Sequence, residues 1–306
     1  MKMFTSFFSL CICLTLSSCS KEEPKPPQYK FSEQVIIDGI RRTYTIKLPQ
    51  NYYQHDSVRA MVIGMHGTGG SAEQFERAYG FNQKADAEGF VAVYPDGVQK
   101  EGGLLKIRTW NAGTCCDFAM ETNVNDVKFI STIIDQISSR FHINRKKVFV
   151  TGMSNGGMMA YRIASELPDK IAAAGIVSAT MVAPKDASKL GVVPIIHIHG
   201  APDTKVPFTG GVGLGDYNFP PVMEGLNYWV TRNQCNDSPV VEQHQGYELK
   251  TWTDNSGKTL VQCYVTQDGG HAWPSSKEQG RMGDTPSTVI NATNLIWDFF
   301  EHFSLP

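Results

Sequence analysis

The chain alternates short apolar runs with segments of helical periodicity, and this alternation limits its fold more than any other feature. The apolar runs at 60–65 and 90–94 lack polar alternation, as strands buried on both faces of a sheet do. Between them, the segment 71–87 is rich in helix formers and is followed by Gly89. A strand, a helix and a second buried strand predict a β-α-β unit with parallel strands.

The same pattern continues towards the C-terminus. Residues 125–141 place apolar side chains on one helical face, and a strand at 148–150 and a helix at 155–166 follow. Strands are also predicted at 171–178, 193–199, 247–253 and 260–266, helices at 222–231 and 288–303, and an antiparallel strand pair within 33–48. The sequence therefore predicts the α/β class, with a mostly parallel central sheet covered by helices on both faces.

Charge and composition exclude several classes of protein. The chain of 306 residues has 28 Lys and Arg against 30 Asp and Glu, and its basic blocks are as short as Arg41-Arg42 and Arg145-Lys146-Lys147. It lacks the phosphate-neutralising surface that nucleic-acid binding needs, so no nucleic-acid partner is expected. A hydrophobic content of 41%, with Gly and Pro spread along the chain, excludes a disordered, collagen-like or coiled-coil protein.

The segment Gly152-Met-Ser154-Asn-Gly156 is a G-x-S-x-G motif between a predicted strand and a predicted helix. This context is typical of a nucleophilic serine on a tight turn, where the positions two before and two after the serine must be small. The following helix directs its N–H groups towards charge that develops near the hydroxyl. We therefore predict that Ser154 is a catalytic nucleophile.

A second glycine-rich loop, His66-Gly-Thr68-Gly-Gly70, follows the predicted strand at 60–65. Glycines there let the backbone approach a bound carbonyl oxygen, so we assign the two oxyanion-hole donors to the N–H groups of Thr68 and Asn155. The loop lacks the G-K-[ST] ending and the G-x-G-x-x-G spacing of phosphate-binding loops.

The acid and the base are expected in the chain order Ser, Asp or Glu, His, which is the order of the α/β-hydrolase fold. Asp203 follows a buried strand and His271 follows the strand at 260–266 after two glycines. His197 and His199 lie within a predicted strand and are interpreted as structural residues, and Asp96 is interpreted as a turn residue.

Together these residues predict acyl transfer through an acyl-enzyme, for which neither a metal nor an organic cofactor is required. A metal site at His197 and His199 would need a further ligand, and we expect none. A serine peptidase is the nearest alternative. A non-catalytic, surface glycan-binding lipoprotein is the alternative from another class, although a binding module has no need of a strained serine turn.

Over about residues 40 to 300 the chain resembles secreted α/β-hydrolase esterases of the polyhydroxybutyrate depolymerase and feruloyl esterase type. The motifs H-G-T-G-G, Y-P-D-G, T-W-N-A-G-T-C-C, G-M-S-N-G-G, H-G-A-P-D-T and G-G-H-A-W-P occur in the family's order. The resemblance implies that Ser154, Asp203 and His271 form a catalytic triad. It implies the same oxyanion hole, although Thr68 stands where many members have Cys.

The resemblance also implies that Trp110 and Trp273 are aromatic walls of the substrate cleft. Such walls would suit feruloyl or acetyl esters on plant polysaccharide fragments, and small-molecule or oligosaccharide esters are the expected substrates. A depolymerase of polyhydroxybutyrate or its oligomers, and a generalist esterase for short acyl chains, remain as alternatives.

The first residues have the pattern of a signal peptide, because Lys2 precedes an apolar stretch too short to span a bilayer. Leu16-Ser-Ser-Cys19 resembles a bacterial lipobox. We therefore expect a leader at 1–18, lipidation of Cys19, a polar tether at 19–29 and a catalytic domain at 30–306. The protein would be exported and anchored to a membrane, in the periplasm or at the cell surface. An ordinary secretory signal cut nearby is the alternative.

Export would leave Cys115, Cys116, Cys235 and Cys263 in an oxidising compartment, which favours disulfides. We predict a bridge between Cys235 and Cys263, because it would anchor the loop that carries His271. Cys115 and Cys116 would then pair with each other or stay reduced. Four cysteines allow three connectivities, so the pattern alone does not decide.

Overall fold

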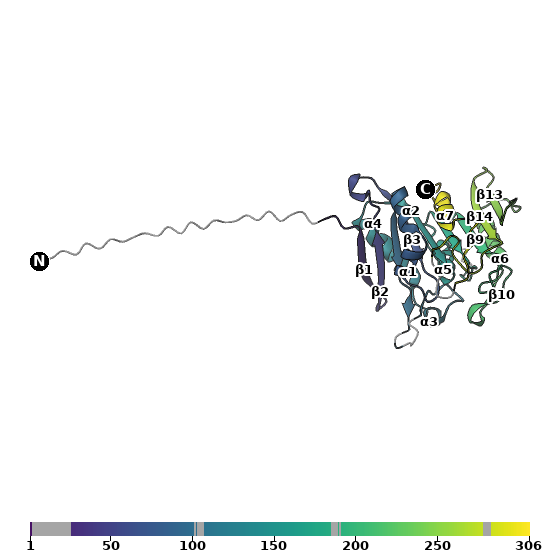
Figure 1. The fold of residues 1–306 in the computed structure, drawn as a ribbon, viewed down its shortest axis with the longest axis horizontal. Helices are drawn as coiled ribbons and strands as arrows, with labels where there is room; N and C mark the ends of the chain where they lie inside the picture. Colours follow the sequence, from purple (N-terminus) through teal and green to yellow (C-terminus); the bar gives the residue numbers. More distant parts are fainter. Residues whose placement is uncertain (2–25, 101, 103–106, 185–188, 190, 278–282) are drawn as a thin grey trace.

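The computed structural model describes residues 1, 26–100, 102, 107–184, 189, 191–277 and 283–306. Among these residues a sheet of ten strands runs in the order β1-β2-β4-β3-β7-β8-β9-β14-β13-β12 (Figure 1). The strands are β1 (Lys30–Ile37), β2 (Ile40–Lys47), β3 (Arg59–Met65), β4 (Val91–Pro95), β7 (Ile143–Met153), β8 (Ala173–Val177), β9 (Ile195–Gly200), β12 (Val240–His244), β13 (Tyr247–Thr253) and β14 (Thr259–Thr266). The neighbours from β4 through β14 pair in parallel, and the remaining pairs at both edges are antiparallel.

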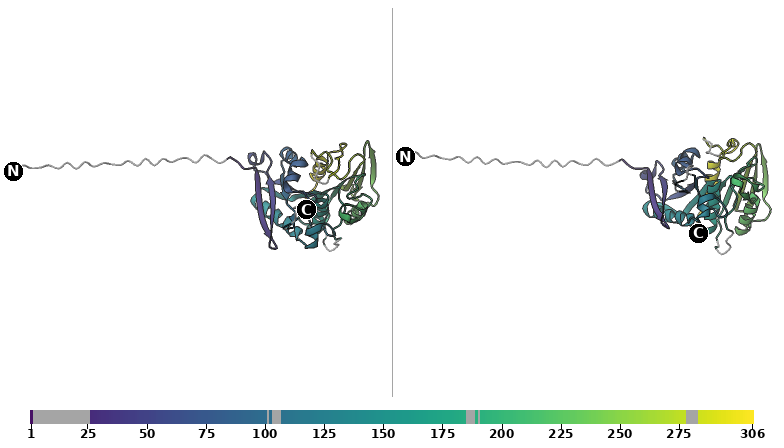
Figure 2. Two further views of the ribbon diagram at one scale, coloured as in Figure 1. Left: turned by 60° about the horizontal axis from the view of Figure 1, so that its bottom comes forward. Right: turned by 90° about the horizontal axis from the view of Figure 1, so that it is seen from below.

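Helices cover both faces of this sheet (Figures 1 and 2). Side chains of α1 (Ala72–Ala78), α2 (Phe81–Glu88) and α7 (Ala292–Phe300) pack in one core cluster. Side chains of α4 (Asp126–Arg140), α5 (Asn155–Glu166) and α6 (Val222–Arg232) pack in another. Successive residues of β3 alternate between the two clusters, as the period of a strand requires. The predicted α/β class, with a mostly parallel sheet between helices, is confirmed.

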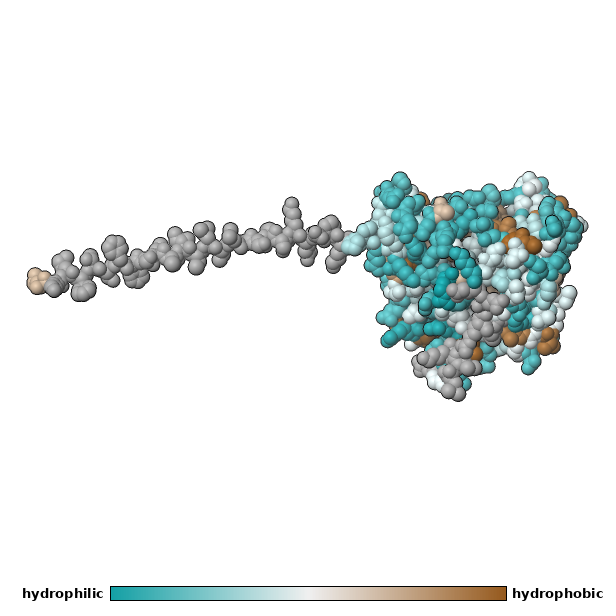
Figure 3. Space-filling view, viewed as in Figure 1, coloured by the Kyte–Doolittle hydropathy of each residue, from teal (hydrophilic) through white to brown (hydrophobic). Residues whose placement is uncertain are grey.

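Shorter elements lie in the connections. They are the helix α3 (Asp117–Glu121), the 3₁₀ turns η1 (Tyr52–Gln54) and η2 (Leu214–Asp216), and the two-stranded pairs β5 (Val98–Gln99) with β6 (Arg108–Thr109) and β10 (Gly211–Val212) with β11 (Asn218–Phe219). No helix within the described ranges is both long and apolar enough to cross a membrane. The face seen in Figure 3 is mostly hydrophilic, with scattered apolar patches.

Three segments of the main sheet and its covering helices differ from the sequence prediction. The helix predicted at 71–87 is two helices, because Gly80 takes a left-handed conformation (φ 75°) between α1 and α2. The last helix begins later than predicted, after Asn291, whose side chain accepts a hydrogen bond from Asn294 N. Strand β12 was not predicted, since every residue in it is exposed and it shows no alternation of burial.

The order of the strands explains where the candidate residues meet. Ser154 follows β7, Asp203 follows β9 and His271 follows β14, and these strands are linked through β8 as parallel neighbours. The carboxyl ends of parallel neighbours lie at one edge of the sheet. Three positions that are far apart in the sequence therefore come together at that edge.

Candidate active site

Ser154 occupies a strained turn between β7 and α5. Its backbone angles are φ 55° and ψ −127°, outside the regions that a serine ordinarily adopts. A Cβ on Gly152 would overlap the Gly156 carbonyl, and a Cβ on Gly156 would overlap the carbonyls of Met65 and His66. Both flanking positions must therefore be glycine in this backbone.

The structure brings Ser154, His271 and Asp203 into one hydrogen-bonded row. The distance from His271 Nε2 to Ser154 Oγ is 2.9 Å, and from His271 Nδ1 to Asp203 Oδ2 it is 2.8 Å. The three residues are 7%, 3% and 3% exposed, respectively. This geometry lets the imidazole take a proton from the hydroxyl while the carboxylate holds the ring and balances its charge.

The carboxylate of Asp203 is held at both oxygens. Oδ1 accepts hydrogen bonds from the backbone N–H groups of Lys205 and Val206, each at 2.9 Å. Burial by itself would raise the pKa of Asp203, but hydrogen bonds from His199 and His271 outweigh burial and hold that pKa well below its usual value. Asp203 therefore stays ionised at neutral pH.

The loop at 66–68 passes directly beside the serine. A Cβ on Gly67 would lie 3.2 Å from Ser154 Cβ. Asn155 is the first residue of α5, so its N–H has no partner within the helix. Within the described ranges, the N–H of Thr68 has no hydrogen-bond acceptor either. The loop and the start of the helix thus flank Ser154.

His66 fixes this loop to a neighbouring turn, a role that the sequence analysis did not assign. The N–H of Gly97 donates to His66 Nε2 at 2.9 Å, so the ring proton is on Nδ1 and donates to Gly67 O at 2.8 Å. Burial lowers the pKa of His66 to about 4, which keeps the ring neutral. The Y-P-D-G motif is therefore tied to the H-G-T-G-G loop through one buried imidazole.

Below pH 6.5, this histidine is expected to make the fold sensitive to acid. Between pH 6.5 and about 4 the unfolded chain binds a proton at His66 that the folded protein does not, so stability falls as the pH falls. The shift corresponds to about 3 kcal/mol at the bottom of this window. Urea unfolding at pH 7, 5.5 and 4.5 measures the loss. His66→Asn keeps a donor near Nδ1 and should flatten the pH dependence, and an unchanged slope in this variant would contradict the assignment.

The prediction that Trp110 and Trp273 form cleft walls is wrong in this structure, because both indoles are interior, at 0% and 1% exposure. Trp110 Nε1 donates to His66 O at 2.9 Å, and the Trp110 backbone bonds both polar atoms of the Asn155 side chain. Trp273 stacks on Tyr79, with 4.7 Å between ring centroids. A large apolar ring with one satisfied N–H is stable in a core. The two tryptophans therefore pack in the interior beneath the site.

The predicted bridge between Cys235 and Cys263 is also wrong, since both thiols are free and Cys115 pairs with Cys116. Cys263 pairs in register with Lys250, whereas Cys235 pairs with Asp254, four residues further along the same strand direction. Four residues of extended chain span about 13 Å, which exceeds the reach of a disulfide. Cys19 lies outside the described residues, and its lipidation stays a prediction.

Asp284 is a second residue that the sequence analysis did not identify. Its Oδ2 accepts the backbone N–H of His271 at 2.8 Å, and its Oδ1 bonds the Lys205 ammonium. One carboxylate therefore joins the loop of the candidate base to the loop of the candidate acid.

We expect Asp284→Ala to lower kcat by about tenfold, because a lost charge-assisted hydrogen bond is worth about 1.5–3 kcal/mol and part of it orients His271. Steady-state kinetics on an aryl ester measures the change. Asp268→Ala is a matched control, since Asp268 bonds Ser287 and Thr288 and makes no bond to His271. Equal losses in the two variants would contradict a specific role for Asp284.

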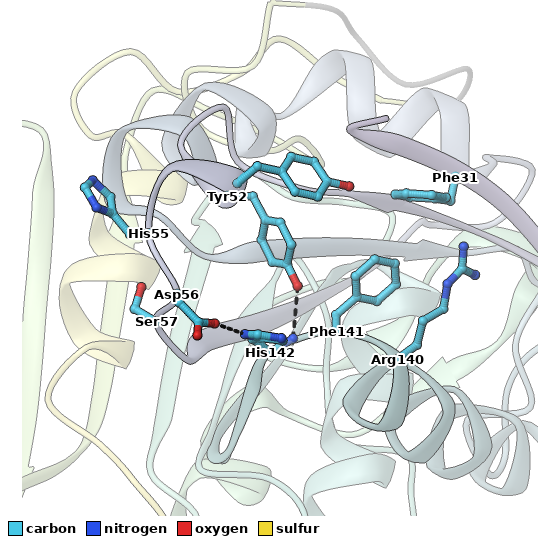
Figure 4. A pocket seen from close by; sticks show the side chains of 9 residues that line it. Phe31, Tyr52, His55, Asp56, Ser57, Arg140, Phe141 and His142 are labelled. Carbon is cyan, nitrogen blue, oxygen red and sulfur yellow. Dashed lines mark hydrogen bonds and ion pairs between the residues drawn. The ribbon is translucent and has the colours of Figure 1, made fainter. Parts of the chain in front are cut away.

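A separate pocket of about 440 Å³ lies near the amino ends of β3 and β7, at the sheet edge opposite Ser154 (Figure 4). It contains Ser57, His142 and Asp56, and His142 Nδ1 lies 2.7 Å from Asp56 Oδ1. The side chains of this His–Asp pair are 60% and 89% exposed, and no dashed line joins Ser57 to the histidine (Figure 4). This pocket and the candidate active site thus contain the same three residue types, but they differ in burial and in hydrogen bonding.

The sheet order, the strained serine and the buried row of Ser154, His271 and Asp203 define an α/β hydrolase. The sequence profile of the Phospholipase/Carboxylesterase family matches residues 52–217, and the chain belongs to that family. Among solved structures, an acetyl xylan esterase from Aspergillus awamori superposes with a TM-score of 0.63 at 16% identity, covering 89% of this chain and 99% of that one.

Three curated relatives are between 25% and 31% identical to this chain. Feruloyl esterase B of Piromyces equi is 28% identical over 87% of this chain and 46% of its own length, and feruloyl esterase C of Emericella nidulans is 25% identical over 88% of each. NocK of Nocardia uniformis subsp. tsuyamanensis is 31% identical over 58% of this chain and 50% of its own length. The chain thus spans about half the length of the Piromyces and Nocardia proteins. The resemblance to feruloyl esterases that the motifs indicated is confirmed.

Proposed function

We propose that the protein is a serine carboxylesterase that works through an acyl-enzyme. The observation that carries the proposal is the continuous hydrogen-bonded path from Ser154 Oγ through His271 to Asp203, at 2.9 and 2.8 Å, on a strained strand-to-helix turn. A fold does not need a positive-φ serine aligned with a buried His–Asp pair, and nucleophilic catalysis does.

In the proposed reaction, Ser154 Oγ attacks the ester carbonyl carbon while His271 Nε2 takes the hydroxyl proton. The tetrahedral intermediate collapses, the C–O bond to the alcohol breaks, and His271 returns the proton to the departing oxygen. Water, deprotonated by the same nitrogen, then attacks the acyl carbon, the bond from that carbon to Ser154 Oγ breaks, and His271 returns the proton to Ser154 Oγ as the acid leaves. Asp203 remains a carboxylate throughout and stabilises the imidazolium.

The oxyanion of each intermediate is proposed to bind the N–H groups of Asn155 and Thr68. Support comes from the start of α5, where Asn155 N–H is unused, and from the loop beside Ser154. The positive end of the α5 dipole adds to the same stabilisation. Both donors belong to the backbone, so side-chain substitution at Thr68 should change activity less than substitution of the nucleophile.

The proposed substrates are feruloyl esters on plant polysaccharide fragments, with acetyl esters as the second choice. This specificity is supported by the feruloyl esterases of Piromyces equi and Emericella nidulans, whose likeness extends over more than four-fifths of this chain. The interior positions of Trp110 and Trp273 remove the argument from aromatic cleft walls.

The purified protein should first be treated with a fluorophosphonate probe, which should label Ser154 and leave Ser154→Ala unlabelled. Hydrolysis is then compared on methyl ferulate, acetylated xylan, a p-nitrophenyl ester series, polyhydroxybutyrate oligomers and aminoacyl amides. Release of ferulate at the highest kcat/KM supports the proposal. Preference for amides would instead indicate a peptidase, and absence of labelling would contradict an acyl-enzyme.

We also propose export with lipid attachment at Cys19, on the basis of the apolar leader and the Leu-Ser-Ser-Cys junction. Metabolic labelling with a radioactive fatty acid in a bacterial host tests this. Label should enter the processed chain that begins at Cys19 and be lost in Cys19→Ala, whereas unlabelled protein released to the medium would favour an ordinary secretory signal.

A further inference from the structure

A row of buried polar rings extends from the Asp203 carboxylate into the core. Tyr161 Oη lies 2.9 Å from His197 Nδ1, and His197 Nε2 lies 3.1 Å from His199 Nδ1. His199 Nε2 lies 2.8 Å from Val206 O and 3.4 Å from Asp203 Oδ2. Both histidines and the tyrosine are 0% exposed. Apolar side chains would fill this space at lower cost, so the polar rings need another explanation.

The acceptors at one end fix the direction of every hydrogen bond in the row. Val206 O and Asp203 Oδ2 can only accept, so His199 Nε2 carries the proton. In a neutral ring Nδ1 of His199 then accepts from His197 Nε2, and His197 Nδ1 accepts from the Tyr161 hydroxyl. All the bonds point towards Asp203, and aligned bonds of this kind strengthen one another.

His199 also holds the turn that carries the acid. The Val206 carbonyl accepts from His199, and the Val206 N–H donates to Asp203 Oδ1. The two imidazole rings are stacked at an interplanar angle of 10° on one face of β9, so they are anchored to a central strand. Burial, together with the neighbouring His199, lowers the pKa of His197 well below its usual value, in agreement with a neutral His197 ring.

We propose that His199 is a positioning residue for Asp203: its single N–H fixes the turn at 203–206 and shares the charge of the carboxylate with His271, while His197 and Tyr161 orient that N–H. The inference rests on the proposed esterase function only for its kinetic readout. Without this N–H, the whole charge of the Asp203 carboxylate would face His271.

The groups that face this row are few within the described part of the chain. Cys263 on β14 pairs in register with His197 and lies near Tyr161, and burial raises its pKa to about 12, so it remains a neutral thiol. Lys205 and Asp284 face the acid and the base from two loops and neutralise each other. A change in the titration of His271 after substitution of His199 therefore reports on Asp203.

The test compares wild type with His199→Phe and His199→Gln. The phenylalanine removes the donor and keeps a ring, and the glutamine amide restores a donor near Nε2. In His199→Phe we expect kcat to fall by about tenfold to a hundredfold, with KM changed less than about twofold. The acidic limb of the kcat/KM profile should move to higher pH, because the undivided charge of Asp203 stabilises the His271 imidazolium. His199→Gln should recover most of both effects.

Asn233→Ala is the matched control, because the buried Asn233 amide bonds Val193 N and O just before the amino end of β9. It should lower Tm and leave the pH profile unchanged. Tyr161→Phe provides a milder variant that keeps the ring volume. It should move the acidic limb of the kcat/KM profile to higher pH, by less than His199→Phe does. If His199→Phe does not fold, this variant carries the test.

The downfield NMR resonance of the His271 Nδ1 proton gives a readout that needs no substrate, and His271→Ala identifies it. Its titration should move to higher pH in His199→Phe. An unmoved titration and an unmoved acidic limb, with Tm lowered as in Asn233→Ala, would overturn the proposal. If wild type hydrolyses no ester, the proposed function fails, and the NMR titration still decides the role of His199.

Discussion

Ser154→Ala is expected to lower kcat/KM on any hydrolysed ester by at least about 10⁴-fold, while Tm changes by no more than a few degrees. The side chain contributes one hydrogen bond, to His271, and the serine backbone conformation is set by the packing of Gly152 and Gly156. The loss is therefore chemical rather than structural. His271→Ala should have a similar effect, and the double variant should be no worse than either one, because the residues act as one unit.

Asp203→Asn tests the assignment of the acid with little change of shape, because an amide cannot balance the imidazolium and favours the wrong tautomer of His271. We expect a loss of about 10⁴-fold in kcat. Asp96→Asn is its control, since Asp96 accepts from Ala72 N and Thr43 Oγ1 and serves a turn. Near-normal turnover in Asp203→Asn together with inactive Asp96→Asn would reverse the assignment of the acid.

The largest stability effect is expected at the buried ion pair between Arg42 and Asp126. The two side chains are 1% and 0% exposed, Arg42 Nη2 lies 2.6 Å from Asp126 Oδ1, and Asp126 Oδ2 accepts the N–H of Asn111. Asp126→Ala would leave a guanidinium buried without its counter-charge, which costs about 3–5 kcal/mol. Urea unfolding at pH 7 measures this loss.

Asp135→Ala is a matched control on the same helix, α4. Asp135 lies 2.6 Å from Lys170, but the two side chains are 49% and 27% exposed, so its removal should cost no more than about 1 kcal/mol. Comparable losses at positions 126 and 135 would contradict the view that the buried pair dominates. Because Asn111 belongs to the loop that contacts Asn155, Asp126→Ala should also lower activity in the fraction that remains folded.

The sequence predicted those features that depend on local pattern. Apolar runs identify strands that are buried on both faces, and the glycines around Ser154 reflect a backbone contact that admits no side chain. The chain order of serine, acid and base then follows from parallel strands that end at one edge. These features need no knowledge of which distant residues touch.

The features that were missed depend on long-range contacts. An indole that lines a cleft and one that packs in the core can have the same local sequence, and Trp110 packs in the core, where its N–H donates to His66 O. Cysteine pairing depends on register, which placed Cys235 and Cys263 opposite different residues of β13 and its extension. The roles of His66 and His199 depend on distant hydrogen-bond partners, which the local sequence of a loop or a strand does not reveal.

The place where the N-terminal segment joins the fold has a consequence for the proposed lipid attachment. Tyr53 Oη donates to Gln28 O and its ring contacts Tyr29, just before β1 pairs its first residue, Lys30, with Lys47. Lys47 in turn lies opposite Ala92, near the amino end of β4, so the chain enters the domain on the side away from Ser154. With the lipid attachment proposed at Cys19, the tether would join the domain on the side opposite its catalytic edge, so the anchor itself would leave that edge free for substrates arriving from solution.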